Sequence, residues 1–200
     1  MSDCSAAVVG PAGVLAELQA TGARGQVAAL PAMAQAVLAQ VGIVPRQLAM
    51  VAVTIGPGSF TGIRAALSLA HGIALAANVP IVGVTIGEAL RVPDNGREQW
   101  VAIDTRRGRV FLDWGNGVAT AGLDALPYPD GPVSLAGDAA AIVASSFAER
   151  GADVLLLPVR LPTPAGIAAA AQRRVSAGPD TRPVQPLYVD PPEARPAKSA

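Results

Sequence analysis

The sequence predicts an α/β fold with a largely parallel sheet, built as two lobes. Short segments rich in β-branched residues alternate with segments whose apolar residues recur at helical spacing. Such alternation is typical of parallel strands that are connected by helices. In addition, an order of hairpin, helix, strand and helix occurs in each half of the chain. This repeated order indicates two lobes of related construction.

The first half opens with a predicted hairpin. Apolar segments at 6–9 and 14–18 flank a turn that contains Gly10 and Gly13. A helix is expected from about Gln26 to Val41, because apolar side chains fall on one stripe and Pro31 lies in the first turns, where proline is tolerated. The other elements expected in this half are a strand at 50–55, a helix from Ser59 or Thr61 to about Ala77, a strand at 81–84 and a short helix at 86–91.

The second half opens with another predicted hairpin, formed by segments 100–104 and 110–114. A polar segment at 92–98 is the candidate boundary between the lobes. The elements expected after the hairpin are a strand at 133–136, a helix at about 138–150, a strand at 154–157 and a helix at about 164–177. We therefore expect a first lobe at 1–95, a second lobe at 96–178 and a proline-rich tail at 179–200, tethered by Leu187, Tyr188 and Val189.

The composition excludes several classes of protein. With 51% hydrophobic and 15% charged residues, the chain can form a buried core, so extensive disorder is excluded. The 15 basic and 15 acidic residues cancel, which leaves no excess charge for holding nucleic acid by phosphate contacts alone. A single cysteine, Cys4, excludes an internal disulfide and suits a reducing compartment. A single histidine, His71, excludes the common His/Cys zinc sites.

A membrane span and a secretory signal are both disfavoured. The segment 65–87 is long enough to cross a bilayer and carries no formal charge apart from His71. However, a break at 78–80 divides it, and much of its first part is alanine, serine and glycine. We interpret it as a buried helix followed by a buried strand. Because the first residues form no basic region before an apolar segment, we expect a cytoplasmic protein.

The most specific motif runs from Gly56 to Gly62, where a strand passes into a helix. Backbone N–H groups at such a turn point outward from a positive helix end, which suits an anion such as phosphate. The spacing matches neither the dinucleotide fingerprint, which needs glycine at the position of Thr61, nor a P-loop, which needs Lys and Ser or Thr after Gly62. On spacing, a tight turn that caps the helix is the favoured interpretation.

The helix after this motif carries two sets of small residues at intervals of four, which places each set on one face. The two sets are Gly62, Ala66, Ala70 and Ala74, and then Ser68, Gly72 and Ala76. Faces without bulk let another backbone approach closely. Two alternatives stay open for them, packing on the protein's own sheet and packing on a partner.

Several motifs together resemble the bacterial TsaB family, also called YeaZ. They are the segment 56–64, the segment 70–74, the segment 80–83, the segment 102–108 and the closing Pro186-Leu187-Tyr188-Val189. The resemblance covers nearly the whole chain. It implies an ASKHA fold, in which two lobes resemble actin-like ATPase and ribonuclease H domains, in agreement with the repeated order of elements. It also implies a place in the system that installs threonylcarbamoyladenosine in tRNA.

The same resemblance implies a non-catalytic relative of the transferase TsaD that binds TsaD as a scaffold subunit. The helices from Gln26 and Thr61 would form the interface, and an overlapping surface would serve a homodimer. A TsaE-type ATPase would join through the complex, and tRNA would be contacted only indirectly. ATP and metal would be held by the transferase, with no cofactor on this chain. The interface residues predicted in this way are Gly56, Pro57, Gly58, Ser59, Phe60, Thr61, Gly62, Arg64, Ala66, Ala70, Met33 and Val37.

The residue types agree with a role without catalysis. TsaD-like proteins hold a metal with paired histidines, which one histidine cannot supply, so a metalloprotease is not expected. Ser59 lacks the sequence of a nucleophile elbow, which disfavours a serine hydrolase. The alternative function is an ATPase or small-molecule kinase of the same superfamily acting alone, with the segment 56–62 and Asp104 around a nucleotide.

Asp104, Gly137 and Asp138 form a candidate vestigial nucleotide site, because related proteins place a carboxylate at the end of the strand that Asp104 ends. The simpler interpretations are a solvated hairpin turn for Asp104 and a helix N-cap for Asp138. Glu88 and Arg91 are interpreted as exposed helix charges. Weak or absent ATP binding by this chain alone is expected.

One strand of the first lobe is predicted to be missing. TsaB family members usually begin with an apolar strand that ends in Asp-Thr, whereas this chain begins at Met1, Ser2 and Asp3. The second lobe keeps the equivalent strand at 101–105. A missing central strand leaves buried backbone groups unpaired, at about 1 to 3 kcal/mol each. We expect the true start of translation to lie upstream, which mass spectrometry of the native protein tests.

Overall fold

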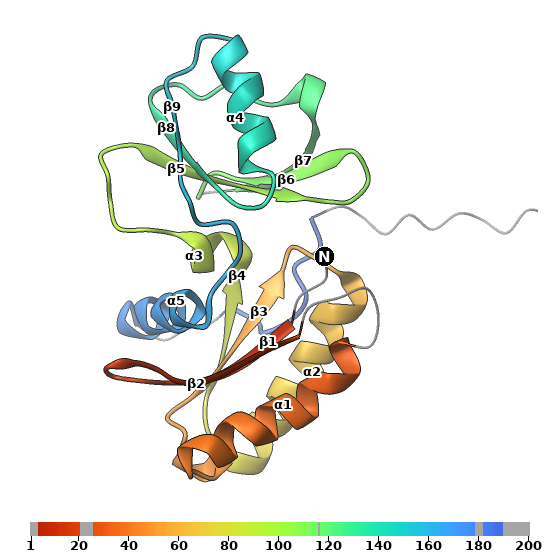
Figure 1. The fold of residues 1–200 in the computed structure, drawn as a ribbon, viewed down its shortest axis with the longest axis vertical. Coiled ribbons are helices and arrows are strands. Elements are labelled where there is room, and N and C mark those ends of the chain that lie inside the picture. Colours follow the sequence, from red (N-terminus) through yellow and green to blue (C-terminus); the bar gives the residue numbers. More distant parts are fainter. Residues whose placement is uncertain (1–3, 21–25, 116, 179–181, 190–200) are drawn as a thin grey trace, which may run out of the picture.

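The chain folds into two lobes that lie one above the other along the long axis of the molecule (Figure 1). The computed structural model describes residues 4–20, 26–115, 117–178 and 182–189. Expectations for residues 1–3, for the start of the tail at 179–181 and for its end at 190–200 lie outside the described residues. The mixed α/β architecture confirms the predicted fold class. The expectation of a largely parallel sheet was wrong, because among the described residues three strand pairs are antiparallel and three are parallel.

The strands of the first lobe form two separate pairs. β1 (Cys4–Gly10) and β2 (Gly13–Ala20) make the predicted antiparallel hairpin. β3 (Val51–Gly56) and β4 (Ile81–Thr85) make a parallel pair. Within the described residues no ladder joins β1 to β3. Because each of these two strands is paired on one side only, the sheet of the first lobe is open at its centre.

Helices cover both faces of these strands. Figure 1 shows α1 (Gln26–Val41) and α2 (Phe60–Ala77) on one side and α5 (Pro164–Ser176) on the other. α2 begins where Ser59 caps it, since the Gly62 N–H donates to Ser59 Oγ at 3.3 Å. It ends at Asn78, whose left-handed φ of 58° stops the helix. A 3₁₀ turn, η1 (Pro45–Gln47), precedes β3, and the short α3 (Ile86–Leu90) follows β4.

The second lobe is a complete five-stranded sheet with the order β7-β6-β5-β8-β9. Its strands are β5 (Glu98–Asp104), β6 (Arg109–Asp113), β7 (Val118–Gly122), β8 (Val133–Ala136) and β9 (Val154–Leu156). β5 is central, antiparallel to β6 and parallel to β8. A 3₁₀ turn, η2 (Leu123–Ala125), follows β7, and α4 (Ala140–Glu149) follows β8. β7 was not among the predicted strands.

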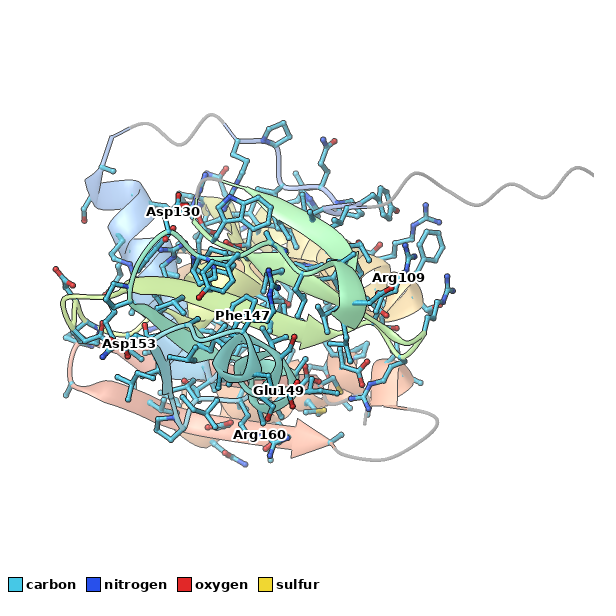
Figure 2. The ribbon with its side chains drawn as sticks, turned by 90° about the horizontal axis from the view of Figure 1, so that it is seen from above. Arg109, Asp130, Phe147, Glu149, Asp153 and Arg160 are labelled. Atoms are coloured by element: carbon cyan, nitrogen blue, oxygen red, sulfur yellow. The ribbon has the colours of Figure 1, made fainter. Side chains whose placement is uncertain are left out.

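The core of the second lobe lies between this sheet and α4. Phe147 of α4 is fully buried, and Figure 2 shows it in the middle of the lobe. Its ring meets Trp100 of β5 edge-on, with the ring centroids 5.7 Å apart. Val143, on the turn of α4 before Phe147, is also fully buried against the same cluster. This apolar stripe is the reason why α4 forms at the position that its sequence predicts.

The last helix belongs to a different lobe from the one expected. The prediction placed 164–177 in the second lobe, but Ala170 and Ala171 of α5 pack with Val82, Val84 and Ala89 of the first. α5 begins after Thr163, whose Oγ1 accepts from the Gly166 N–H at 3.1 Å. The chain therefore returns to the first lobe after it completes the second, and α5 covers the face of the strands opposite α1 and α2.

The described part of the tail is tethered, as predicted, and its contacts are with the first lobe. The Leu187 N–H donates to the Ile55 carbonyl at 2.8 Å, which places the tail beside the end of β3. Val184 and Leu187 pack against the cluster that contains Ile55. The tether therefore consists of a backbone hydrogen bond and apolar contacts at the turn that begins α2.

Candidate partner-binding face and lobe junction

The turn from β3 to α2 requires glycine at position 56 for two reasons. Gly56 has φ of +118°, a conformation that L side chains rarely adopt. A Cβ there would also meet Ile63 Cδ1 at 3.1 Å and the Leu187 carbonyl oxygen at 3.2 Å. The described geometry thus accounts for this glycine by backbone conformation and by the close approach of the tail. Together with the Ser59 cap, it bears out the interpretation as a capping turn.

A cation–π stack forms at the start of α2. The guanidinium of Arg64 lies 3.8 Å from the centroid of the Phe60 ring and 5.9 Å from that of Tyr188. Arg64 Nε donates to the Tyr188 hydroxyl at 2.9 Å. Phe60 and Tyr188 remain 56% and 50% exposed. The stack joins the tail to α2 and presents two aromatic rings on the surface.

One side of α2 is exposed over its whole length. We call it the α2 outer face and define it by Phe60, Arg64, Ser68, His71, Gly72, Leu75 and Ala76, all of which are exposed. Leu75 is 86% exposed, the highest value among the large hydrophobic residues described. His71 Nε2 lies 2.9 Å from the Val184 carbonyl, so the tail also borders this face.

The two sets of small residues have different environments. Ala70 and Ala74 are buried, Gly62 and Ala66 are partly buried, and this set packs within the chain. Ser68, Gly72 and Ala76 lie on the α2 outer face instead. Packing within the protein's own lobe therefore accounts for the first set, and packing on a partner stays a prediction for the second.

Several residues predicted for the interface are not on the surface. Met33 is 8% exposed, Val37 2% and Ala70 6%, and Gly56 and Pro57 are also buried. α1 points its apolar stripe toward β1, where Val37 packs with Val8 and Ala16. These residues can position the α2 outer face but cannot contact a partner while the chain keeps this structure. Gly58, Ser59, Phe60, Thr61 and Arg64 are exposed, as the prediction requires.

A second cluster of polar residues lies at the junction of the lobes. Asp138 Oδ1 accepts from the Asp104 N–H at 2.8 Å, and Asp104 Oδ1 accepts from the Arg106 N–H at 2.7 Å. The Arg106 side chain lies 3.5 Å from the Asp104 carboxylate and 3.4 Å from that of Asp138. Gly137, which directly precedes Asp138, has φ of +109°, and a Cβ there would collide with the Ala102 carbonyl. The structure thus brings the three predicted residues together.

The chemistry of this cluster does not favour a nucleotide. Arg106 pairs with both carboxylates that a metal–phosphate site would need and balances one of their two negative charges. Asp104 and Asp138 line two cavities, one of about 200 Å³ and one of about 1520 Å³, so the pairing with Arg106, and not the size of the adjoining space, argues against a nucleotide. The prediction of Asp138 as an N-cap was wrong, because Ala139 occupies that position and the Asp138 carboxylate bonds to the Asp104 backbone.

Glu88 forms a cluster that sequence analysis missed. Its carboxylate lies 2.9 Å from Arg174 of α5 and 2.8 Å from Arg182 of the tail, and it accepts from the Thr85 N–H at 2.7 Å. Burial alone would raise the pKa of Glu88, but the hydrogen bonds from Arg182 and Thr85 outweigh burial and lower it. The interpretation as an exposed helix charge was wrong for Glu88, whereas Arg91 is exposed, 3.7 Å from Asp113.

Comparisons with known proteins agree on one family. The family model described as TsaD, tRNA N6-adenosine threonylcarbamoyltransferase, matches residues 14–118. An uncharacterized protein of Mycobacterium tuberculosis is 32% identical over 190 residues, covering 92% of this chain and 83% of that protein. The tRNA threonylcarbamoyladenosine biosynthesis protein TsaB of Escherichia coli is 38% identical over 60 residues, covering 28% of this chain and 26% of that protein.

Solved structures give the same result for the fold. An uncharacterized protein from Pseudomonas aeruginosa with similarity to peptidase YeaZ superimposes with a TM-score of 0.73 at 21% identity, over 94% of each chain. YeaZ from the same organism superimposes with a TM-score of 0.65 at 22% identity, over 93% of this chain and 94% of that one. The chain therefore belongs to the TsaB/YeaZ family and has its two-lobed, ASKHA-like fold.

Proposed function

We propose that this chain is a non-catalytic scaffold subunit that binds a TsaD-type transferase and thereby supports threonylcarbamoyladenosine modification of tRNA. The α2 outer face carries the proposal. Apart from Arg64 and His71, which contact the tail, it consists of small and apolar residues, and all of its residues are exposed in the described structure. The description of the related Escherichia coli TsaB as a tRNA threonylcarbamoyladenosine biosynthesis protein supports the pathway.

The physical character of this face suits a helix of another protein. Distances between packed helices are about 8 to 10 Å and depend on the side chains at the contact, so Ser68, Gly72 and Ala76 allow the close end of that range. Phe60, Arg64 and Tyr188 stand at one end of the face, and aromatic and arginine side chains are enriched among residues that dominate binding energy. The small residues would let the partner helix approach α2 closely, and the stack of Phe60, Arg64 and Tyr188 would anchor that helix.

The hydropathy of α2 supports a covered outer face. Among the described residues α2 is the one helix with the length and mean hydropathy of a membrane span. Its inner side, which includes Leu67, Ala70 and Ala74, is buried within the lobe, and its outer side carries Arg64 and His71. We propose that a protein partner, and not lipid, covers the outer side, in a cytoplasmic complex.

We propose that the transferase, and not this chain, carries out the chemical reaction. Arg106 already pairs with the carboxylates of Asp104 and Asp138, so we propose that ATP and metal are held by the transferase and that this chain has no cofactor of its own. A TsaE-type ATPase and tRNA would meet this chain only through the complex. A homodimer through the α2 outer face would compete with the transferase for the same residues.

Substitutions that introduce a positive charge on the α2 outer face test the proposal directly. A Cβ at Gly72 meets nothing within 4 Å, so Gly72→Arg adds bulk and charge outside the fold. We expect Gly72→Arg and Ala76→Arg to abolish capture of the TsaD-type transferase from the same organism, with unchanged circular dichroism. Ala148→Arg, at an exposed position of α4, is the matched control. Equal capture by all three variants would contradict the interface.

The rival function, an ATPase or kinase acting alone, has a separate test. Isothermal titration of the isolated chain with Mg-ATP should give no micromolar binding, because Arg106 already pairs with both carboxylates. Micromolar binding accompanied by turnover would favour the rival.

A further inference from the structure

The described tail residues 182–189, which we call the strap, connect two clusters of the first lobe. At the beginning of the strap, the Arg182 guanidinium meets the Glu88 carboxylate of α3 through two hydrogen bonds of 2.8 Å and 3.2 Å, one to each carboxylate oxygen. Such a charge-assisted, two-point contact is stronger than a bond between neutral groups. At the end of the strap, the Tyr188 hydroxyl accepts from Arg64 Nε of α2. The strap therefore links the Glu88 cluster to the cation–π stack.

The sequence of the strap makes it stiff. It contains Pro183 and Pro186 and no glycine, and none of its residues is in a helix or strand. Proline fixes its own φ and disfavours the helical conformation of the residue before it, so a segment of this kind stays extended. The backbone between positions 182 and 188 can span at most about 20 Å. A short, extended segment that is held at one end restricts where its other end can lie.

The middle of the strap makes few backbone hydrogen bonds to the rest of the described chain. The Leu187 N–H donates to the Ile55 carbonyl at 2.8 Å, and the Val184 carbonyl lies 2.9 Å from His71 Nε2. Val184 also lies over the bare backbone of Gly83, where a Cβ would meet Val184 Cγ1 at 3.4 Å. A segment with few backbone bonds can open locally while the rest of the fold stays intact. The side-chain contacts at the two ends of the strap therefore matter for keeping it in place.

The stack at the end of the strap presents a guanidinium to the surface. Arg64 donates through Nε to Tyr188, and its Cζ lies 3.8 Å from the centroid of the Phe60 ring. Arg64 is exposed, and within the described part of the chain its two Nη groups make no hydrogen bond. A planar guanidinium with both Nη groups available matches a carboxylate in a two-point contact. The strap thus holds Arg64 in an orientation that suits an acidic residue of another protein.

We propose that Arg182 and Glu88 are positioning residues for the partner contact. By holding the strap, they keep Tyr188 against Arg64, and Arg64 then binds a carboxylate of the transferase. This inference rests on the proposed function, because the transferase supplies the carboxylate. If the strap is docked in only a fraction of the molecules, the dissociation constant rises by the inverse of that fraction.

Arg182→Ala is the variant that releases the strap with the least damage elsewhere. Glu88 keeps its ion pair with Arg174 at 2.9 Å, so this substitution does not leave a half-buried carboxylate without a counter-charge. Arg173→Ala is the matched control. Arg173 belongs to the same cluster, but it donates to an α3 carbonyl at 3.0 Å and not to the strap.

Opening of the strap is measured first, on the chain without its partner. In Arg182→Ala, exchange of the Leu187 amide hydrogen should become faster by about tenfold or more. The Nε–H NMR signal of Arg64, assigned by its loss in Arg64→Lys, should move toward the position of an unstacked arginine. Exchange in β8 of the second lobe should not change, and Arg173→Ala should change neither reading. An unchanged Leu187 exchange rate and an unchanged Arg64 signal in Arg182→Ala would overturn the proposal.

Titration with the TsaD-type transferase of the same organism then measures the effect on binding. The dissociation constant should rise about tenfold for Arg182→Ala and stay the same for Arg173→Ala. In an Arg64→Lys background, Arg182→Ala should cause no further rise, because the residue that it positions is gone. A released strap with an unchanged dissociation constant, or a full additional rise in the double variant, would overturn this inference alone. No binding by the unchanged chain would refute the proposed function and this inference together.

The chemistry of the acceptor on the transferase is tested with Arg64→Gln, which removes the positive charge. The resulting rise in the dissociation constant should be smaller at high ionic strength than at low ionic strength, because salt screens the attraction between a guanidinium and a carboxylate. A rise that does not depend on salt would indicate an uncharged acceptor and would overturn the assignment of a carboxylate.

Discussion

Asp138 and Asp104 are joined across the second lobe by a hydrogen bond of 2.8 Å from the Asp104 N–H to Asp138 Oδ1. This bond ties Asp138, which lies two positions before α4, to the end of β5, and it holds two carboxylates beside Arg106. Asp138 is therefore a positioning residue of the lobe junction. Its side chain is only 20% exposed, so water replaces the lost acceptor poorly.

The first prediction concerns this bond. Asp138→Ala should lower the free energy of unfolding by about 1 to 2 kcal/mol, because the Asp104 N–H loses its partner. Asp138→Asn keeps an acceptor oxygen and should lower the free energy of unfolding by less. Urea unfolding followed by circular dichroism measures both, with Asp130→Ala at an exposed position as the control. A stability of Asp138→Ala equal to that of the unchanged protein would show that the bond contributes nothing.

The second prediction concerns pH and Glu88. Its pKa is lowered in the folded chain from the ordinary value of 4.5, so its ionised form stabilises the fold. This contribution is fully present above the unfolded pKa and is lost as the pH falls through the lower folded pKa. Glu88→Gln should therefore be less stable than the unchanged protein at pH 7, and the difference should shrink at about pH 3 to 4.

Unfolding in urea at both pH values measures this difference. Glu149→Gln is the matched control, because Glu149 is exposed at the end of α4. Glu149→Gln should not lower the free energy of unfolding comparably at pH 7. A difference between Glu88→Gln and the unchanged protein that stays constant from pH 7 to pH 3 would contradict the assigned role.

The third prediction contrasts two glycines. Gly56→Ala should destabilise the protein by about 1 to 3 kcal/mol, since it forces a strained backbone and a contact with the Leu187 carbonyl. Gly72→Ala, in the middle of α2 and in open space, should stabilise it by about 0.5 to 1 kcal/mol. Thermal unfolding measures both. Limited proteolysis should also cut the tail near 182–189 faster in Gly56→Ala, because Leu187 is displaced from Ile55.

The fourth prediction separates stability from binding with two phenylalanines. Phe147→Ala should lower the free energy of unfolding by about 3 to 5 kcal/mol, because the ring is fully buried against Trp100. Phe60→Ala should lower it by about 1 kcal/mol or less, because the ring is half-exposed and stacks on Arg64.

Binding to the transferase should rank these two variants in the opposite order. Phe60→Ala should weaken capture while keeping the fold, and Phe147→Ala should affect capture only as far as it unfolds the chain. Normal capture by folded Phe60→Ala would remove the stack from the proposed interface.

Much of the fold could be predicted because its signals are local. The stripe in α1, the capping turn before α2 and the apolar segment of β8 lie within single elements, and the structure has them at or within a residue of the expected bounds. β7 (Val118–Gly122) was missed because its alanine, threonine and glycine residues give no apolar alternation. It forms as a strand because β6 pairs with it.

The missed parts of the site depend on residues distant in sequence. Asp138 acts on Asp104, 34 positions earlier, and Glu88 meets arginines 86 and 94 positions later. No local sequence pattern reveals such pairs. An acidic residue near the start of a helix has the same sequence context whether it caps the helix or contacts a distant residue. The small residues of α2 were correctly recognised as two faces, but only burial shows which face remains exposed.

The return of α5 to the first lobe has a mechanical consequence. The polypeptide crosses between the lobes twice, once after α3 through 91–97 and once before α5 through 157–163. Two covalent connections between the lobes resist twisting of one lobe against the other. They leave a hinge motion, in which the lobes open and close about the line through the two connections, comparatively free. A fragment that ends after the first crossing would lack the α5 residues that cover Val82, Val84 and Ala89, so the lobes are not separable modules.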